Sequence, residues 1–426
     1  MNRLTQLIKS DMTLALGVTE PGAIAFSVAK ARSYTSGKLK CIKVCMNSGM
    51  YKNAFTCGIP NSDKVGNIFA AALGYVAGNA NKGLEALADV TESDNDAAQE
   101  LIEQDKVKVE LSGITSRIYI QATVETDLDK AVVTIRNSHT NIIKIEVNEK
   151  VVYEGKEMHT SENVDIEEVA LIHKYTLADI LEYADTVSAE EIDFVSEAYR
   201  ANLELFHEGL NSSKTTFART LLEINGGEII SNDERNTASL LCNGAIEARV
   251  IGLDKPAMSI TGSGAHGIIA TMPLYAVYKI NHLSEEQLHR ATMLSYLVCT
   301  YIKEYSGKLS AFCGCAIAAG AGMACGICYL KGGRLKEMEY ILNNMASSIT
   351  GMICDGAKPS CALKCASGVS MAVLSALMAK NGRCVKSVEG IIDDDVDKSI
   401  RNLTDIGRDA MVHTDAMILR IMTSKC

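Results

Sequence analysis

Apolar and polar residues alternate in short runs between residues 117 and 155. The runs are RIYIQATVET, AVVTIRN, NIIKIEVN and KVVYEG, with polar turns between them. Alternation with a period of two is typical of strands that bury one face of a sheet and expose the other. Another strand is expected at KLKCIKVCM, with helices at residues 4–16, 21–32 and 65–77. This part of the chain therefore predicts a mixed region with a small antiparallel sheet.

From about residue 171 the apolar residues recur at helical spacing, as in TLADILEYADTV and SEEQLHRATMLSYLVCTYIKEY. Two further stretches, 311–329 and 366–378, have no polar face. Amphipathic helices around wholly apolar ones indicate a layered helical domain with buried central helices. We expect an α+β protein with a mixed domain at 1–165 and a helical domain at 166–426, joined by the linker EMHTSENVDIEE.

Composition narrows the function classes. The chain has 426 residues, a formal charge of −10 and no Trp, so the basic face and stacking rings of a nucleic-acid binder are not evident. The uncharged stretch from Leu309 to Leu330 could span a bilayer, but it consists of Ala, Gly and Cys and lysines flank it. A buried helix is the better interpretation. The first residues lack the apolar core of a signal peptide, so we expect a cytoplasmic protein.

Fourteen cysteines without a secretion signal indicate reduced thiols, which serve metal binding, catalysis or packing. Eight of them fall in the 67 residues from Cys299 to Cys365. Such a concentration favours a metal or cluster site over random packing.

Three of these cysteines have a spacing that suits a metal. Cys354 and Cys361 flank the turn DGAKPS, and CGC at 313–315 precedes an apolar helix that can return to this turn. Three thiolates hold a [4Fe–4S] cluster and leave one iron open to a ligand. Zinc can use the same three thiolates with water in the fourth position. Spacing alone leaves both possibilities open.

A glycine-rich turn, SITGSGAHGIIATMP, contains a nominal GxGxxG. A dinucleotide site needs a preceding strand and an uninterrupted helix, whereas Pro273 interrupts this helix and the surroundings look helical. The turn can instead hold a substrate carboxylate on free amides at a helix N-terminus. The expected substrate contacts are Gly262, Ser263, Gly264 and Gly267.

Two further segments carry polar side chains. Glu20 directly precedes Pro21, where a helix begins, and this position is typical of a capping carboxylate. The segment NSGMYKNAF supplies one cation among polar uncharged groups, which either grips a substrate carboxylate or forms an ordinary loop. Its candidate residues are Asn47, Ser48, Lys52 and Asn53.

Several segments together resemble a known family. TEP, MYKNAFTCGIP, GSGAHGI, GKLSAFCGCAIAAGAG, YLKGG and GMICDGAKPSCALK occur in this order in serine dehydratase-like proteins, and the nearest branch is the L-cysteine desulfidases. The resemblance implies an oxygen-sensitive [4Fe–4S] lyase without pyridoxal phosphate. Such an enzyme eliminates the β-substituent of a small amino acid and releases pyruvate and ammonia, with sulfide if the substrate is cysteine. The cluster ligands it implies are Cys354, Cys361 and Cys313, with Cys315 in reserve.

The chain departs from the family pattern at two places. Val18 stands where the family has a proposed catalytic cysteine, and Ala265 and His266 replace an Asn-Gln pair. These changes leave a second expectation open, which is a cluster- or zinc-containing sensor that kept the fold. The candidates for proton transfer are His266, within the glycine-rich turn, His139, on an exposed turn between two strands, and Glu20.

Cys426 is the last residue. It is either an incidental thiol on a frayed tail or, as the resemblance implies, a residue that folds into the active site and caps the open iron. The expected partners are a small amino-acid substrate and a second copy of the chain in a homodimer.

Overall fold

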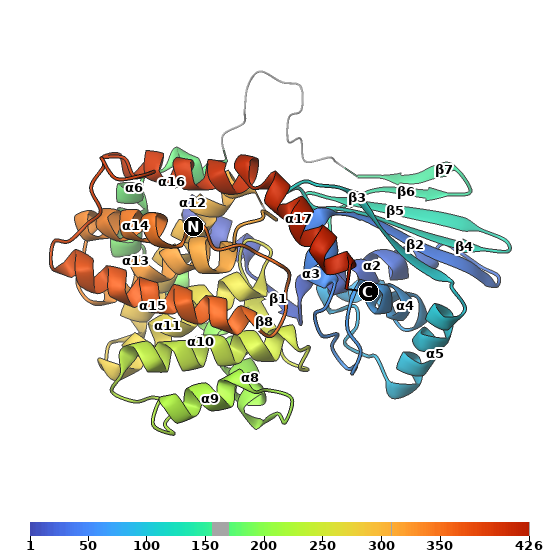
Figure 1. Cartoon of the computed structure of the whole chain (residues 1–426), viewed down its shortest axis with the longest axis horizontal. Coiled ribbons are helices and arrows are strands. Elements are labelled where there is room, and N and C mark those ends of the chain that lie inside the picture. The colour runs from blue at the N-terminus through green and yellow to red at the C-terminus, as the bar shows by residue number, and fades with distance from the viewer. Residues whose placement is uncertain (156–169, 308, 426) are drawn as a thin grey trace, which may run out of the picture.

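The computed structural model describes residues 1–155, 170–307 and 309–425. One half of the molecule is a body of helices, and the other half is a twisted sheet with helices on one face (Figure 1). Each half has its own hydrophobic core. The predicted α+β class is confirmed. The predicted linker and the boundary at residue 165 lie outside the described residues, so the domain division stays a prediction.

The sheet has six strands in the order β3-β2-β4-β5-β6-β7. They are β2 Leu39–Asn47, β3 Val107–Gly113, β4 Tyr119–Thr126, β5 Lys130–Arg136, β6 Ile142–Val147 and β7 Lys150–Glu154. All neighbours are antiparallel except β2 and β3, which run parallel. Five strands match the predicted runs. The sequence pattern missed β3, because four of its seven residues are charged, polar or Gly and most of it is exposed.

Helices α2 (Thr19–Arg32) and α4 (Asn67–Val76) cover one face of this sheet. Helix α2 packs on β4 and β5, and α4 packs on α2. The alternating inward residues of β4, such as Ile120, Ala122 and Val124, are fully buried under them. This packing fixes the N-terminus of α2, which carries Glu20, beside the helical half.

The predicted helix at 4–16 is wrong in its second part. Helix α1 (Arg3–Asp11) ends early, and Thr13–Leu16 form strand β1, which pairs antiparallel with β8 (Pro256–Ser259). Pairing with a strand far along the chain overrides the local helical pattern. The helical half is consequently not purely helical, and the first residues of the chain belong to its core.

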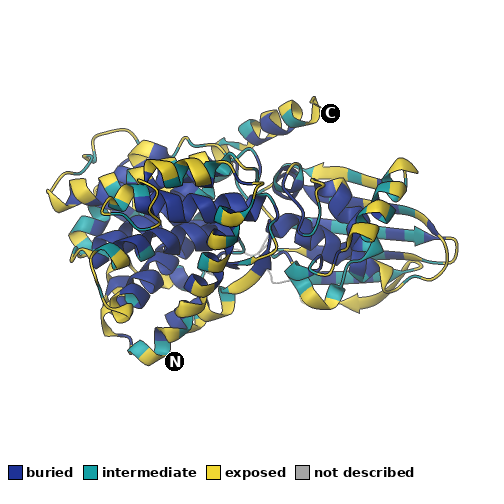
Figure 2. Ribbon diagram, turned by 90° about the horizontal axis from the view of Figure 1, so that it is seen from below, coloured by how far each residue is buried: buried dark blue, intermediate teal, exposed yellow. Residues whose placement is uncertain are grey.

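The helical half is layered as predicted. Its centre is formed by α10 (Glu234–Val250), α11 (Gly264–Ile280), α12 (Glu285–Ser306) and α13 (Gly320–Leu330). Around them lie α6 (Leu177–Thr186), α8 (Ser196–Asn211), α9 (Phe217–Ile224), α14 (Leu335–Ile349) and α16 (Val396–Asp405). Figure 2 shows the central helices as buried along their length. A π-helical turn, Cys315–Ala319, leads into α13.

Two sequence expectations about these helices need correction. Helix α11 runs through Pro273 without a break, and a short strand precedes it. The two-stranded antiparallel pairing of β1 and β8 is nevertheless unlike the parallel sheet of a dinucleotide-binding unit. Helix α15 (Cys361–Lys380), which has no polar face, is not buried all round, because Leu363, Leu374 and Leu377 are exposed.

Helix α15 is the one described helix that is long and apolar enough to cross a membrane by length and composition, and 39% of its apolar window is buried inside the protein. The stretch from Leu309 to Leu330 folds instead into a loop, the π-helical turn and α13, whose residues are almost all buried. The interpretation of that stretch as a buried core segment agrees with this arrangement.

Two elements near the C-terminus and N-terminus meet where the halves join. Helix α17 (Val412–Thr423) leaves the helical body and packs on α3 (Ser48–Ala54), which follows β2 directly. Figure 1 shows α17 crossing from the helices to the sheet side. The segments that carry the predicted site residues surround this junction.

Candidate functional site

Backbone pairing brings two of the predicted thiols together. Phe312 and Ile353 form an isolated antiparallel bridge. On either side of it, the Cys313 amide donates to Met352 O at 2.7 Å and the Cys354 amide donates to Ala311 O at 2.7 Å. Two segments some forty residues apart in sequence are thereby held edge to edge with a cysteine on each.

The third thiol follows a tight turn. Cys361 is the first residue of α15, and its Sγ lies 3.5 Å from Gly356 O. Gly356 has φ of +101°, and a Cβ there would meet Lys52 O at 2.7 Å, so only glycine fits. Asp355 forms ion pairs with both Lys358 and Lys364, which close the turn. The turn thus folds back as the sequence predicted.

These thiols line one cavity of about 70 Å³. We call its cysteine side the thiol wall, which consists of Cys313, Cys315, Cys354, Cys361 and Cys365. The same cavity is lined by Glu20, Asn53, Arg249 and Ser263, which together with His139 we call the polar wall.

The thiols of CGC have different protonation tendencies. The Cys315 thiol donates a hydrogen bond to Cys313, and together with the Ala316 amide it outweighs the effect of burial and lowers the pKa of Cys313 below its usual range. The same hydrogen bond and burial raise the pKa of Cys315 well above its usual range. Burial raises the pKa of Cys361 to about 11. Of the pair, Cys313 is the thiol that becomes a thiolate more readily, and a thiolate is what ligates metals.

The arrangement of the thiols can be compared with the requirements of the two groups that the sequence left open, a zinc ion and a [4Fe–4S] cluster. Among the described residues, no three His, Cys, Asp or Glu side chains lie close enough to share one metal ion, so a mononuclear zinc site is not preformed. A four-iron cluster binds each thiolate through a different iron, so its ligands stand farther apart than those of one ion. Three thiols around one cavity fit that arrangement, with Cys313, Cys354 and Cys361 as ligands.

Glu20 lies in the first turn of α2, as expected, but its carboxylate is directed into the site. It is 4% exposed, and its Oε1 accepts a hydrogen bond of 2.8 Å from Asn53 Nδ2. Burial raises the pKa of Glu20, but the His139 imidazole, the Asn53 amide and the Arg249 charge outweigh it and lower this pKa to about 2. Glu20 is therefore an ionised carboxylate in a buried position.

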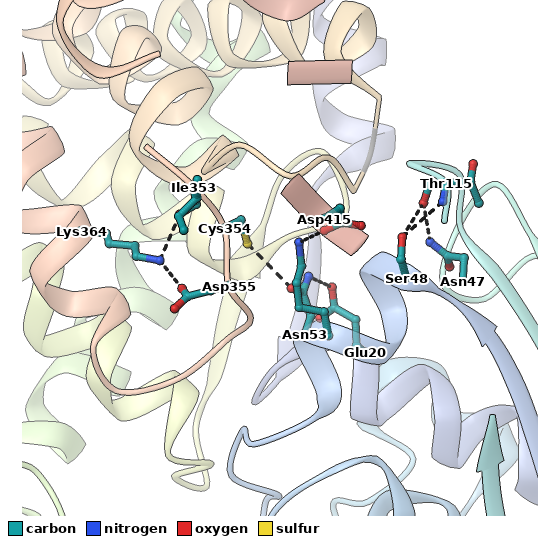
Figure 3. A network of polar contacts seen from close by, with 11 residues as sticks. Glu20, Asn47, Ser48, Asn53, Thr115, Ile353, Cys354, Asp355, Lys364 and Asp415 are labelled. Atoms are coloured by element: carbon teal, nitrogen blue, oxygen red, sulfur yellow. Dashed lines mark hydrogen bonds and ion pairs between the residues drawn. The ribbon is translucent and has the colours of Figure 1, made fainter. Parts of the chain in front are cut away.

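Asn53 connects the two walls. Its Oδ1 accepts from the Cys354 thiol at 3.8 Å while its Nδ2 holds Glu20 (Figure 3). One side chain thus spans the thiol wall and the polar wall.

The expectation that His139 is exposed is wrong. The loop between β5 and β6 folds inward, His139 is only 6% exposed, and its Nε2 lies 3.8 Å from Glu20 Oε1. Among the described residues, this nitrogen has no hydrogen-bond partner. The imidazole faces an adjoining cavity of about 70 Å³ that shares Glu20, Asn53, Ser263, Cys315 and Cys354 with the first one.

His266 lines the adjoining cavity from the first turn of α11. Its Nδ1 lies 2.5 Å from Thr261 Oγ1, which fixes the orientation of the ring. Its Nε2 would lie 3.1 Å from a Cβ on Gly314, so it reaches the CGC segment. Both histidines from the sequence analysis are therefore brought to one site.

The residues of the glycine-rich turn have different roles. Gly262, Ser263 and the start of α11 lie at the cavities. Gly267 does not reach them, because it packs on β8, where a Cβ would come within 1.9 Å of Met258 O. Gly267 therefore allows close helix–strand packing, and the predicted substrate contact is replaced by a structural role.

Three of the polar residues expected around α3 are used within the fold. Asn47 and Ser48 hydrogen-bond to Thr115, and neither is among the residues that line these two cavities (Figure 3). Lys52 is 1% exposed, and its Nζ pairs with Asp415 of α17 at 2.6 Å. Of this segment, only Asn53 points its side chain to both walls. The ammonium of Lys52 is already neutralised.

Sequence reasoning missed Arg249 and Lys303, which line the two cavities and are each at most 3% exposed. Both lie within helices whose periodicity looks amphipathic, so their charges suggested solvent. The one available signal was that AIEARVIG surrounds Arg249 with small and apolar residues. The predicted ligand Cys426 lies outside the described residues, although Met422 of α17 approaches Gly356 in the thiol-bearing turn.

Comparison with known proteins places this arrangement in a family. The chain is 41% identical over 424 residues to a UPF0597 protein of Clostridium botulinum, covering 99% of this chain and 98% of that protein. It is 36% identical over 432 residues to a UPF0597 protein of Clostridium tetani, with full coverage of both, and 39% identical over 430 residues to one of Bacteroides fragilis, with 99% and 98% coverage. The name of these relatives states no activity. The family model described as serine dehydratase alpha chain matches residues 81–420, which include the thiol wall and most of the polar wall, and the chain belongs to this family.

Proposed function

We propose that this protein is a [4Fe–4S]-dependent lyase that performs β-elimination on a small amino acid. The substrate is L-cysteine, which gives pyruvate, ammonia and sulfide, or L-serine, which gives pyruvate and ammonia. Family membership supports a dehydratase-like reaction. The observation that carries the proposal is the Asn53 side chain, which joins a cysteine of the thiol wall to the buried carboxylate of Glu20.

The residues that would hold the cluster are Cys313, Cys354 and Cys361. When bound, the cluster supplies a Lewis-acidic iron for the leaving hydroxyl or thiol of the substrate. The protein closes the space around it with the bridge at Phe312 and the turn at Gly356.

His139 is the group that takes the proton from Cα. Its Nε2 is buried, faces the cavity and has no hydrogen bond among the described residues, as a base awaiting substrate requires. Glu20 is ionised, and its Oε1 lies 3.8 Å from the same nitrogen, so its charge stabilises the imidazolium that forms. His266, held by Thr261, is the second group that can carry a proton on the other side of the adjoining cavity.

The proposal is tested by anaerobic reconstitution with iron and sulfide, followed by assays of pyruvate from L-serine and L-cysteine. We expect a brown protein with broad visible absorption and pyruvate from at least one substrate. A colourless protein that binds stoichiometric zinc contradicts the cluster. The cytoplasmic location and the homodimer remain predictions of the sequence.

One observation favours a second candidate, a cluster-containing sensor. Val18 lines the cavity and is 1% exposed, so an apolar side chain occupies the position of the family's proposed catalytic cysteine. A fully loaded cluster without any pyruvate formation supports this candidate over the lyase.

A further inference from the structure

Arg249 is a buried cation that no described residue holds by a hydrogen bond or a close ion pair. It lies near the end of α10, is 3% exposed, and its Nε is inaccessible to water. Among the residues that the structure describes, none forms a hydrogen bond or an ion pair with its guanidinium. A buried charge is costly unless it is paired, so an unpaired one indicates that its partner is a ligand.

The guanidinium lies against the start of α11. A Cβ on Gly264 would come within 2.6 Å of Arg249 Nε, so glycine is what allows this approach. Ser263, the N-cap of α11, makes no capping hydrogen bond with its side chain and lines both cavities. The first backbone amide bonded within the helix is that of Gly267, and no described group bonds to the amides of Gly264 and Ala265 in the first turn.

These features together make an anion site. The N-terminus of a 17-residue helix carries a partial positive charge and free amide donors, and the guanidinium adds a full charge with a planar fork of donors. A carboxylate matches that fork with two parallel hydrogen bonds.

The neighbouring cations are already engaged. Lys52 pairs with Asp415, and Lys364 pairs with Asp355. Glu20, the nearby carboxylate, hydrogen-bonds to Asn53; the Arg249 charge lowers the pKa of Glu20, but the two side chains form no hydrogen bond with each other. A ligand carboxylate at Arg249 would therefore displace no existing partner.

We propose that Arg249, Ser263 and the first turn of α11 bind the α-carboxylate of the substrate. This inference rests on the proposed function and gives it a substrate class: α-amino acids with a free carboxylate. Amino-acid amides and simple amines are excluded. The carboxylate at Arg249 leaves the α-ammonium to the ionised Glu20 and the β-substituent to the thiol wall, since all of these groups line one cavity.

The test compares L-alanine with L-alaninamide, which lack a leaving group and differ in the carboxylate alone. Binding to the reconstituted holoenzyme is measured by calorimetry and by inhibition of pyruvate formation. We expect the wild type to bind alanine ~10–100-fold more tightly than alaninamide, as one charged hydrogen-bonded contact provides. A wild type without this preference overturns the inference, whatever any variant does.

Variants of Arg249 test whether this residue causes the preference for alanine over alaninamide. Arg249→Gln should raise the KM by a similar factor, leave the cluster absorption unchanged and abolish the difference between alanine and alaninamide. Arg249→Lys, which keeps the charge, should retain part of it, and it also serves if the Gln variant does not fold. Arg290→Gln, at a partly buried arginine that binds Glu286 outside the site, is the matched control and should behave as the wild type. A preserved preference in Arg249→Gln overturns the inference.

These experiments distinguish a failure of the carboxylate site from a failure of the proposed lyase function. Alanine binding that depends on Arg249 in a protein that forms no pyruvate supports the carboxylate site and contradicts the lyase. Pyruvate formation with an unchanged KM in Arg249→Gln supports the lyase and contradicts the site.

Discussion

The thiol wall and most of the polar wall face the same cavity, but the two walls are built by different means. The backbone places the thiols: a bridge sets Cys313 and Cys354, and a glycine turn sets Cys361. The residues of the polar wall come from α2, α3, the β5–β6 loop, α10 and α11, and side chains orient one another there. A substitution in the thiol wall should therefore change binding of the cluster, whereas a substitution in the polar wall should change the rate of the reaction.

The largest effect of a substitution in the thiol wall is expected on the iron content of the protein. Cys354→Ser or Cys361→Ser should abolish cluster binding, because a hydroxyl replaces a soft thiolate. Cys325→Ser is the matched control, since Cys325 is fully buried inside α13 and is not among the residues that line the cavity. Iron and acid-labile sulfide are measured after anaerobic reconstitution. Equal iron in all three variants would show that the thiol wall is ordinary packing.

The next effect is on rate. His139→Gln should lower kcat by ~10²–10⁴-fold, the usual contribution of a general base, while cluster absorption stays as in the wild type. His266→Gln gives the comparison within the same cavity. A larger loss of kcat in His266→Gln than in His139→Gln would move the proton transfer to His266 and contradict the assignment.

The third effect is on stability. Lys52→Met should lower the free energy of unfolding by ~3–5 kcal/mol, because it leaves Asp415 buried and unpaired. Adding Asp415→Leu should recover much of the loss, since two apolar groups replace a buried ion pair at little cost. Urea unfolding of the two single variants and the double variant measures this coupling. Strictly additive losses would mean that the ion pair does not hold α17 on α3.

The smallest effect is expected at Val18. Val18→Cys places a thiol of nearly the same size in the cavity, so the fold and the cluster should be unchanged. Elimination from cysteine should rise, but by less than the ~10²-fold of a full general base, because we propose that His139 already takes the proton. Pyruvate and sulfide release by wild type and variant give the comparison. An unchanged rate would mean that the residue at this position takes no part in the chemistry.

The sequence indicated Cys354 and Cys361 as neighbours because the turn that joins them is local in the chain, and it named CGC as the segment that could return to them. Cys354, the turn and Cys361 are adjacent in the chain, and period-two and helical patterns located five strands and the buried central helices. The assembly of the polar wall could not be predicted from local sequence. Glu20 and His139 meet only because α2 packs on the sheet, and Arg249 is buried only because α8, α11 and α15 cover α10. Likewise, β1 forms because it pairs with β8, which lies far along the chain. The local pattern around residue 14 could not show this pairing and predicted a helix.

The bridge between Phe312 and Ile353 also sets an order of events during synthesis. Helices α13 and α14 lie between these two residues, so Cys313 has left the ribosome long before its neighbouring thiol exists beside it. The pair of thiols appears only after both helices have formed and the two segments have met. A group held by both thiols, such as the proposed cluster, would therefore find its complete set of ligands only after this part of the chain has folded.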